Sequence, residues 1–259
     1  MLKTGIAKYW MLLGELVKRD IKIKYKGSAL GIVWSVINPL LIMLVMSVVF
    51  GMLFRFEIEH YIVYLLTGQV FFSFMNEATT ISMNSIIWNG SLLRKIYVPK
   101  YIFPISKVLS TLVNLGFNLI SVFVIMAIDG VTFSWALLMI PVAIFYLFLF
   151  SMGLGLLLAT IVVFFRDIQH IYGVITLAWT YLTPIFYPIS IIEKYENIYV
   201  VIYKLNPMYQ FINYFRILVL EQRVPGIEFN AVCLFYGVVM LFIGLAVFKS
   251  KQYKFLNYV

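Results

Sequence analysis

The sequence predicts an all-α integral membrane protein that crosses the bilayer six times. Of its 259 residues, 63% are hydrophobic and 12% are charged, whereas soluble domains are about 45–50% apolar and about 25% charged. Apolar runs nearly free of charge recur along the chain, and several reach the roughly 20 residues that a helix needs to cross a bilayer core. Lys and Arg gather in the segments between these runs, which indicates membrane topology.

The first element expected is an amphipathic interface helix over residues 5–27. Apolar side chains fall on one face and basic side chains mostly on the other, a pattern typical of a helix lying flat in the headgroup layer. Its lysines would meet anionic membrane lipid there. Four residues are expected to make the contacts of this helix with its surroundings: Trp10, Lys18, Arg19 and Lys22.

Six apolar runs follow and are expected to be transmembrane helices. They cover residues 32–54, 61–86, 108–128, 133–163, 169–188 and 229–248. The segment 190–228, between the last two, is also apolar in part but is broken by Lys204, Asn206 and Pro207. We expect it to form short gate helices at the outer face that dip into the membrane without crossing it.

Both termini are expected in the cytoplasm, because basic residues are retained on that side of a membrane. With this orientation fifteen of the 20 Lys and Arg residues fall on the inner side. The net charge of +9 is therefore a topology signal, and nucleic-acid binding is not expected. The inner loop 91–104 is basic and contains two prolines, which suits docking to a partner; a simple connector is the alternative.

The second predicted span carries a polar stripe at helical spacing: Ser73, Asn76, Glu77, Thr80 and Asn84. A carboxylate near the membrane midplane costs about 2.5–3.5 kcal/mol on insertion scales, so this face should meet protein or water. The stripe either lines a polar substrate pathway, which we favour, or joins helices by hydrogen bonds.

A second face of interest lies in the fifth predicted span, where Tyr172, Thr176, Trp179 and Thr183 align. Aromatic rings beside hydroxyls suit sugars, whose CH faces stack and whose hydroxyls form hydrogen bonds. The alternative is ordinary packing or an interfacial aromatic belt.

The sequence gives little support to catalysis. No GxxxxGK[ST] loop occurs, so an ATP-driven step would need a second polypeptide. The two histidines, His60 and His170, are expected at opposite membrane faces, and metal-binding spacings are missing from the sequence. We therefore expect no bound cofactor or metal; a transferase using Asp167 and His170, or a secondary transporter, is a less favoured alternative.

Five short motifs occur in order along this plan: RDIKIKYKGSALGIVWSVINPLL (19–41), LLRKIYVPKYIFPIS (92–106), FFRDIQHI (164–171), TPIFYP (183–188) and LNP (205–207). Together they resemble the permease subunits of bacterial polysaccharide-exporting ABC transporters, the O-antigen and teichoic-acid exporters. The resemblance runs nearly end to end.

The resemblance implies a homodimer of permeases in the bacterial cytoplasmic membrane, joined to two copies of a cytoplasmic ATPase that holds ATP and Mg. The substrate would be a lipid-linked polysaccharide, with a small drug, ion or lipid as the alternative. Residues 205–220 would form the outer gate. The coupling helix would present to the ATPase Leu92, Leu93, Arg94, Lys95, Tyr97, Pro99, Lys100 and Phe103.

Overall fold

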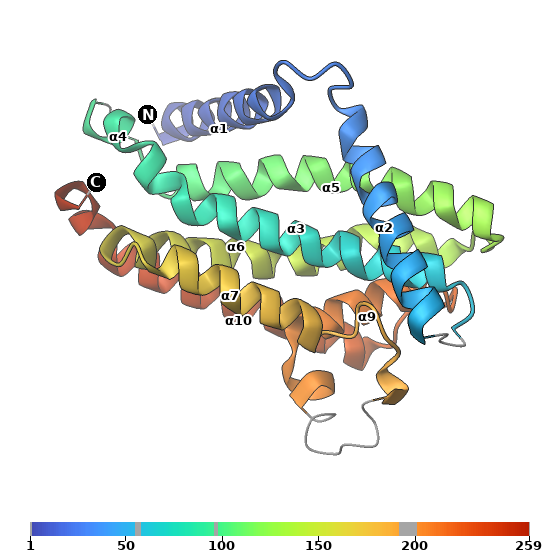
Figure 1. Ribbon diagram of the computed structural model, residues 1–259. Coiled ribbons are helices and arrows are strands. Elements are labelled where there is room, and N and C mark those ends of the chain that lie inside the picture. The colour runs from blue at the N-terminus through green and yellow to red at the C-terminus, as the bar shows by residue number, and fades with distance from the viewer. Residues whose placement is uncertain (1, 55–57, 96–97, 192–200, 259) are drawn as a thin grey trace.

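The computed structural model describes residues 2–54, 58–95, 98–191 and 201–258, and within these ranges the chain is helical without strands (Figure 1). The longer helices are α1 (Leu2–Tyr25), α2 (Val33–Phe54), α3 (Tyr61–Trp88), α5 (Ile102–Asp129), α6 (Ile140–Phe164), α7 (Ile168–Leu182), α9 (Pro207–Val219) and α10 (Ile227–Lys251). The shorter helices are α4 (Gly90–Lys95), η1 (Trp135–Met139), η2 (Ile189–Ile191), η3 (Val201–Leu205) and η4 (Gln252–Asn257).

Three helical stretches of the described chain are long and apolar enough to cross a membrane: Ile102–Asp129, Trp135–Phe164 and Ile227–Asn257. A shorter apolar helix covers Val33–Val49. Helix α3 has the length of a span but carries the polar stripe. The all-helical class is confirmed, whereas the count of six spans stays a prediction.

Helix α1 does not take the position expected of a helix that lies flat in the headgroup layer. It runs along the first half of α5, in the same direction (Figure 1). Trp10 shares a cavity with Ile102, and Tyr25 reaches Asn114, so successive turns of the two helices meet. The reason is that a face of α1 with both Leu16, which is buried, and Asp20, which pairs with Lys107, finds partners on the bundle, and amphipathicity alone does not reveal them.

Figure 1 also shows both chain ends and α4 at one end of the bundle, while the turn after α5 lies at the other. Helix α4 contacts η4 there, so the loop after α3 and the C-terminal turn form one surface. Helix α2 crosses α3 and α5 steeply and packs on both (Figure 1).

Helix α7 is shorter than the predicted span 169–188, because it ends at Leu182. Thr183 adopts an extended conformation (φ −91°, ψ 130°), as a residue before proline favours. Pro184 has no N–H to donate, so the helix cannot continue through it. Residues 183–188 instead form an irregular segment that packs on α3 through hydrogen bonds from Tyr61 and Tyr64.

Helix α9 lies inside the bundle, in contact with α3, α6 and α10. The Asn206 side chain accepts hydrogen bonds from the N–H groups of Met208 and Tyr209, and Pro207 occupies the first turn, so the sequence Asn-Pro begins the helix. Its side chains from Met208 to Val219 are almost all buried. The predicted gate segment therefore contributes a core helix.

Helices α6 and α10 pack closely against each other. A Cβ atom added at Gly244 would lie 2.1 Å from the carbonyl oxygen of Gly153, and one added at Gly153 would lie 2.3 Å from the Met240 backbone. Only glycine permits this separation of the two backbones, as is common where membrane helices pack.

Candidate functional site

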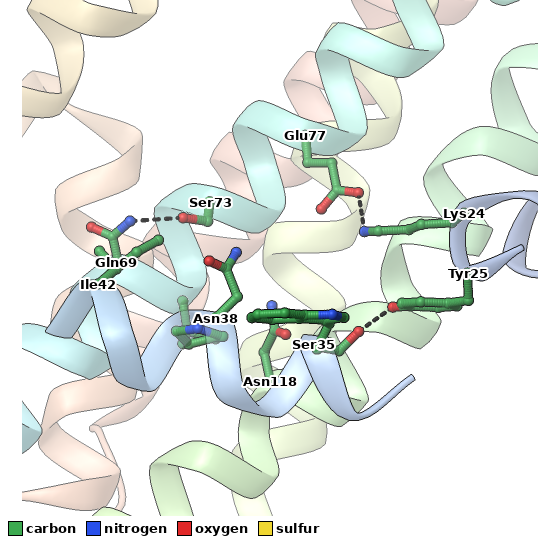
Figure 2. Close-up of a pocket in the computed structure, with 12 residues that line it drawn as sticks. Lys24, Tyr25, Ser35, Asn38, Ile42, Gln69, Ser73, Glu77 and Asn118 are labelled. Atoms are coloured by element: carbon green, nitrogen blue, oxygen red, sulfur yellow. Dashed lines mark hydrogen bonds and ion pairs between the residues drawn. The ribbon is translucent and has the colours of Figure 1, made fainter. Parts of the chain in front are cut away.

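A polar cavity of about 310 Å³ lies where α1, α2, α3 and α5 meet (Figure 2). We call it the polar groove. Its lining consists of Lys24, Tyr25, Trp34, Ser35, Asn38, Pro39, Ile42, Gln69, Val70, Ser73, Glu77 and Asn118. A second cavity of about 470 Å³ shares Lys24 and Glu77 with it and continues beneath α1.

Two ion pairs join α1 to the bundle across these cavities. Lys24 Nζ lies 2.6 Å from Glu77 Oε1, with the two side chains 40% and 32% exposed. Lys107 Nζ lies 2.8 Å from Asp20 Oδ2, with side chains only 12% and 9% exposed. The carboxylate that the sequence places in a membrane helix thus has a cation beside it, contributed by the helix before the first predicted span.

Hydroxyl and amide groups close the α2 side of the polar groove. The Tyr25 hydroxyl donates to Asn114 Oδ1 (3.0 Å) and also contacts the Ser35 hydroxyl. Ser121 donates to the Val36 carbonyl oxygen, which fixes α2 on α5. Asn38 and Gln69 add further amides from α2 and α3, as Figure 2 shows.

The predicted stripe on α3 divides into two parts. Ser73 and Glu77 line the polar groove, and Ser73 accepts a hydrogen bond from Gln69 (3.0 Å). Asn76, Thr80 and Asn84 follow on the same helix but bond along it, from Thr80 to Asn76 (3.4 Å) and from Asn84 to the Thr80 carbonyl (3.3 Å). Thr80 is exposed and Asn84 is buried.

The predicted sugar-binding face of α7 points into the protein. Tyr172 and Thr79 hydroxyls lie 2.6 Å apart, and Trp179 donates to Asn206 (2.8 Å), which in turn donates to Thr183 (2.9 Å). Thr176 is buried and donates to the Tyr172 carbonyl oxygen. Within one chain these residues pack α7 on α3 and α9, and a role in substrate passage stays a prediction.

The predicted coupling segment contains both exposed and buried residues. Arg94 and Lys95 are exposed at the end of α4, Leu92 and Pro99 are partly exposed, and Leu93 is buried. Phe103, at 1% exposure, belongs to the core and cannot contact a partner without rearrangement. Tyr97 lies outside the described residues.

Lys100 connects this segment to the C-terminal turn. Its Nζ donates to the Gln252 carbonyl oxygen (2.6 Å) and lies 5.8 Å from the centre of the Phe255 ring. Partial burial lowers the pKa of the Lys100 ammonium. A basic side chain near unpaired carbonyls at a helix end is the arrangement that the helix dipole favours.

The four residues predicted to make the contacts of the interface helix differ in their exposure and in their ion-pair partners. Trp10 is 69% exposed, and Lys22 is also exposed. Lys18 pairs with Glu15 on the helix surface (2.9 Å). Arg19 lies 3.1 Å from Asp20, so it belongs to the ion-pair network beneath α1.

Arg216 on α9 is 5% exposed and anchors the segment after α7. Its guanidinium donates to the carbonyl oxygens of Pro184 (2.7 Å), Ile185 (3.1 Å) and Tyr64 (3.1 Å). The guanidinium carbon also lies 3.4 Å from the centre of the Tyr64 ring. Gly68 leaves the necessary space, because a Cβ there would lie 2.9 Å from Arg216 Nη2.

The polar groove can bind a hydroxyl-rich or charged molecule, since it offers amides, hydroxyls and a separable ion pair. Among the described residues, no group of three or more His, Cys, Asp or Glu side chains gathers that could hold a metal ion. Sequence reasoning missed Ser35, Asn38, Asn114 and Asn118. Their spacing on α2 and α5 places them on one face of each helix, a signal that could have found them.

Residues 11–220 match the family described as ABC-2 type transporter. The chain is 29% identical to an O-antigen export system permease protein RfbA of Myxococcus xanthus, over 96% of this chain and 95% of that protein. It is 28% identical to a protein of the same name from Klebsiella pneumoniae, over 98% and 97% of the two chains. The capsule polysaccharide export inner-membrane protein CtrC of Neisseria meningitidis serogroup A is 26% identical, over 91% of this chain and 89% of that protein.

Proposed function

The chain belongs to the ABC-2 type transporter family, and from this premise we propose that it is the membrane subunit of an ATP-driven exporter of a lipid-linked polysaccharide. The observation that carries the proposal is its similarity along nearly the whole chain to permeases named for O-antigen and capsule polysaccharide export. A small drug, ion or lipid as substrate is the less favoured alternative.

The proposed assembly is a homodimer in the bacterial cytoplasmic membrane, with six spans in each chain and both termini in the cytoplasm. Two copies of a separate ATPase bind ATP and Mg beneath it. The basic end of α4, with Arg94 and Lys95 exposed, supports its assignment as the coupling helix. Helix α9 and the segment that Arg216 anchors form the proposed outer gate.

The polar groove is the part of the chain that we propose for the substrate path. A polysaccharide presents many hydroxyls, and Asn38, Gln69 and Ser73 offer amides and a hydroxyl that can exchange hydrogen bonds with them. Lys24 and Glu77 satisfy each other while the path is empty. Residues of a second protomer would complete the wall.

The test is a deletion of the gene in its source organism, complemented by variants and read out by the amount of polysaccharide at the cell surface. Loss of surface polysaccharide, with lipid-linked polysaccharide accumulating inside, supports the proposal. Normal surface polysaccharide in the deletion strain refutes it. Failure of a nucleotide-binding subunit to co-purify with the chain refutes the assembly.

Substitutions in the polar groove test the path itself. Ser73→Phe fills part of the cavity and should reduce export at least tenfold at equal protein level. Leu245→Phe, which adds a ring on an exposed position of α10, is the matched control. If the Ser73→Phe and Leu245→Phe variants export equally, the substrate path does not run through the polar groove. Alanine substitutions of Tyr172 or Trp179 are less informative, because both pack inside the protein.

A further inference from the structure

A cavity of about 490 Å³ lies at the end of the bundle where α6 ends and α10 passes into η4. It is remote from the polar groove and is formed by different helices. Its lining consists of Thr160, Ile161, Phe164, Phe165, Val247, Lys251, Lys254 and Tyr258. We call it the C-terminal cavity.

The charge of this lining is unbalanced, because its described residues include two ammonium groups and no side-chain carboxylate. The cations that line the cavities described above and the Arg223 cation each lie beside a carboxylate: Lys24 beside Glu77, Arg19 and Lys107 beside Asp20, and Arg223 beside Glu221. Every ion pair of the described chain involves residues other than Lys251 and Lys254. Within the described ranges, the Lys254 ammonium lies 5.6 Å from the centre of the Tyr253 ring, a contact that uses none of its hydrogen-bond donors.

Most of the remaining lining is apolar, apart from the hydroxyls of Tyr258 and of Thr160, which donates to the Leu156 carbonyl oxygen. Ile161, Phe164 and Val247 are partly buried, and Phe165 is 68% exposed. Phe164 packs on the rings of Tyr258 (4.9 Å between centres) and Phe255 (6.0 Å), so η4 is folded back against the end of α6. Two cations beside a hydrocarbon surface match a ligand that has an anionic head and an apolar tail.

The surroundings favour a bilayer lipid as that ligand. Val239 and Ile243 are exposed on α10, two turns and one turn before Val247 on the same face of the helix, so the apolar wall of the cavity continues along α10. Free inorganic phosphate or a nucleotide would use the cations but leave the apolar wall uncovered. Basic pockets between membrane helices at the cytoplasmic side are suited to anionic headgroups.

We propose that the C-terminal cavity binds one anionic glycerophospholipid, with its phosphate between Lys251 and Lys254 and an acyl chain along Phe165 and Val247. This site is independent of the exported substrate. Because η4 contacts α4, and Lys100 bonds to Gln252, the bound lipid would stabilise the C-terminal turn against the proposed coupling segment.

The experiment uses the full-length chain, with its ATPase if the two co-purify, in a neutral detergent. Native mass spectrometry counts the phosphatidylglycerol retained, with phosphatidylethanolamine as the zwitterionic comparison. Each lysine near a membrane contributes about fivefold to binding of anionic lipid, so Lys251→Gln combined with Lys254→Gln should weaken retention about 30-fold.

Matched variants distinguish the site from general surface charge. Arg223→Gln combined with Lys249→Gln removes the same charge outside the cavity and should leave retention unchanged. Lys251→Arg combined with Lys254→Arg keeps the cations and should bind as the unmodified chain does. Thermal unfolding of all variants verifies that each is folded.

Four lipid-binding results would overturn the proposal. The first two are equal loss of phosphatidylglycerol retention in both double-glutamine variants, and unchanged retention when Lys251→Gln is combined with Lys254→Gln. The other two are retention of phosphatidylethanolamine equal to that of phosphatidylglycerol, and displacement of the bound phosphatidylglycerol by millimolar inorganic phosphate. Protection of the two lysines by the ATPase in the lipid-free complex would likewise assign the cavity to a protein contact.

Discussion

The buried ion pair beneath α1 leads to the most quantitative prediction. Asp20 Oδ2 lies 2.8 Å from Lys107 Nζ, and both side chains are about one-tenth exposed. Asp20→Asn leaves the Lys107 ammonium without its carboxylate, and breaking a buried pair in this way typically costs about 3–5 kcal/mol. The adjoining cavity lets the ammonium regain some hydration, so we expect about 3 kcal/mol, equivalent to roughly 150-fold in the docking equilibrium of α1.

The assay measures how often α1 leaves the bundle. Leu16 is 5% exposed on the packed face of α1, so Leu16→Cys should react with a maleimide only when the helix opens. The native Cys233, which is also buried, is replaced by serine to remove background. The labelling rate should rise about 150-fold in the Asp20→Asn variant, provided that opening and closing are faster than labelling.

Two controls make the prediction specific. Lys18→Gln removes a cation whose pair with Glu15 is mostly exposed, and should change labelling by less than about threefold. Asp20→Asn combined with Lys107→Met removes both buried charges and should label more slowly than Asp20→Asn alone. Labelling of Asp20→Asn at the rate of the Lys18→Gln variant would refute the reasoning.

Further predictions concern packing and protonation. Gly153→Ala or Gly244→Ala should lower stability by about 1–3 kcal/mol or more in thermal unfolding, because the new Cβ meets backbone, whereas Gly173→Ala, which has no atom within 4 Å, should not. Arg216→Met should destabilise by at least about 3 kcal/mol, since three buried carbonyls lose a charged donor, and an unchanged melting temperature would contradict the anchoring role. The lowered pKa of Lys100 means that the unfolded chain binds its proton more readily, so stability should rise with pH between the folded and ordinary pKa values, and Lys100→Met should lack that rise.

The helices were largely predictable from the sequence, and their partners were not. Runs nearly free of charge give the approximate ranges of α2, α3, α5, α6 and α10, because length and hydropathy are local properties. The early end of α7 was missed, although Pro184 marks it, since hydropathy continues through the proline. Span count and orientation depend on the membrane, so they stay predictions.

The candidate site was predicted only in part. Helical spacing identified the stripe containing Ser73 and Glu77, but Lys24, which is 53 residues from Glu77, could be paired with it only once the position of α1 was known. Helical spacing also identified the residues that align with Tyr172 on one face of α7. Periodicity specifies which residues align and leaves open whether they meet a substrate, lipid or another helix, and here Tyr172 meets Thr79.

The continuity of α3 and α4 connects the proposed coupling segment to the polar groove. The Asn89 side-chain amide donates to the Ser85 carbonyl oxygen (2.7 Å). The backbone carbonyl oxygen of Asn89 accepts from the N–H groups of Leu92 and Leu93, so α3 and α4 are tightly joined. A displacement of α4 by an ATPase would therefore act on α3. Glu77 lies on α3 about 20 Å from the start of α4, since a helix rises 1.5 Å per residue.

The two ion pairs determine how α1 would respond to such a displacement. The Lys24–Glu77 pair is partly exposed, and separating a pair of this kind costs about 1 kcal/mol or less. The Asp20–Lys107 pair is buried and several times more costly to break. Movement of α3 should therefore separate Lys24 from Glu77 first, while Asp20 holds α1 on α5, so that the polar groove opens on the side facing α2.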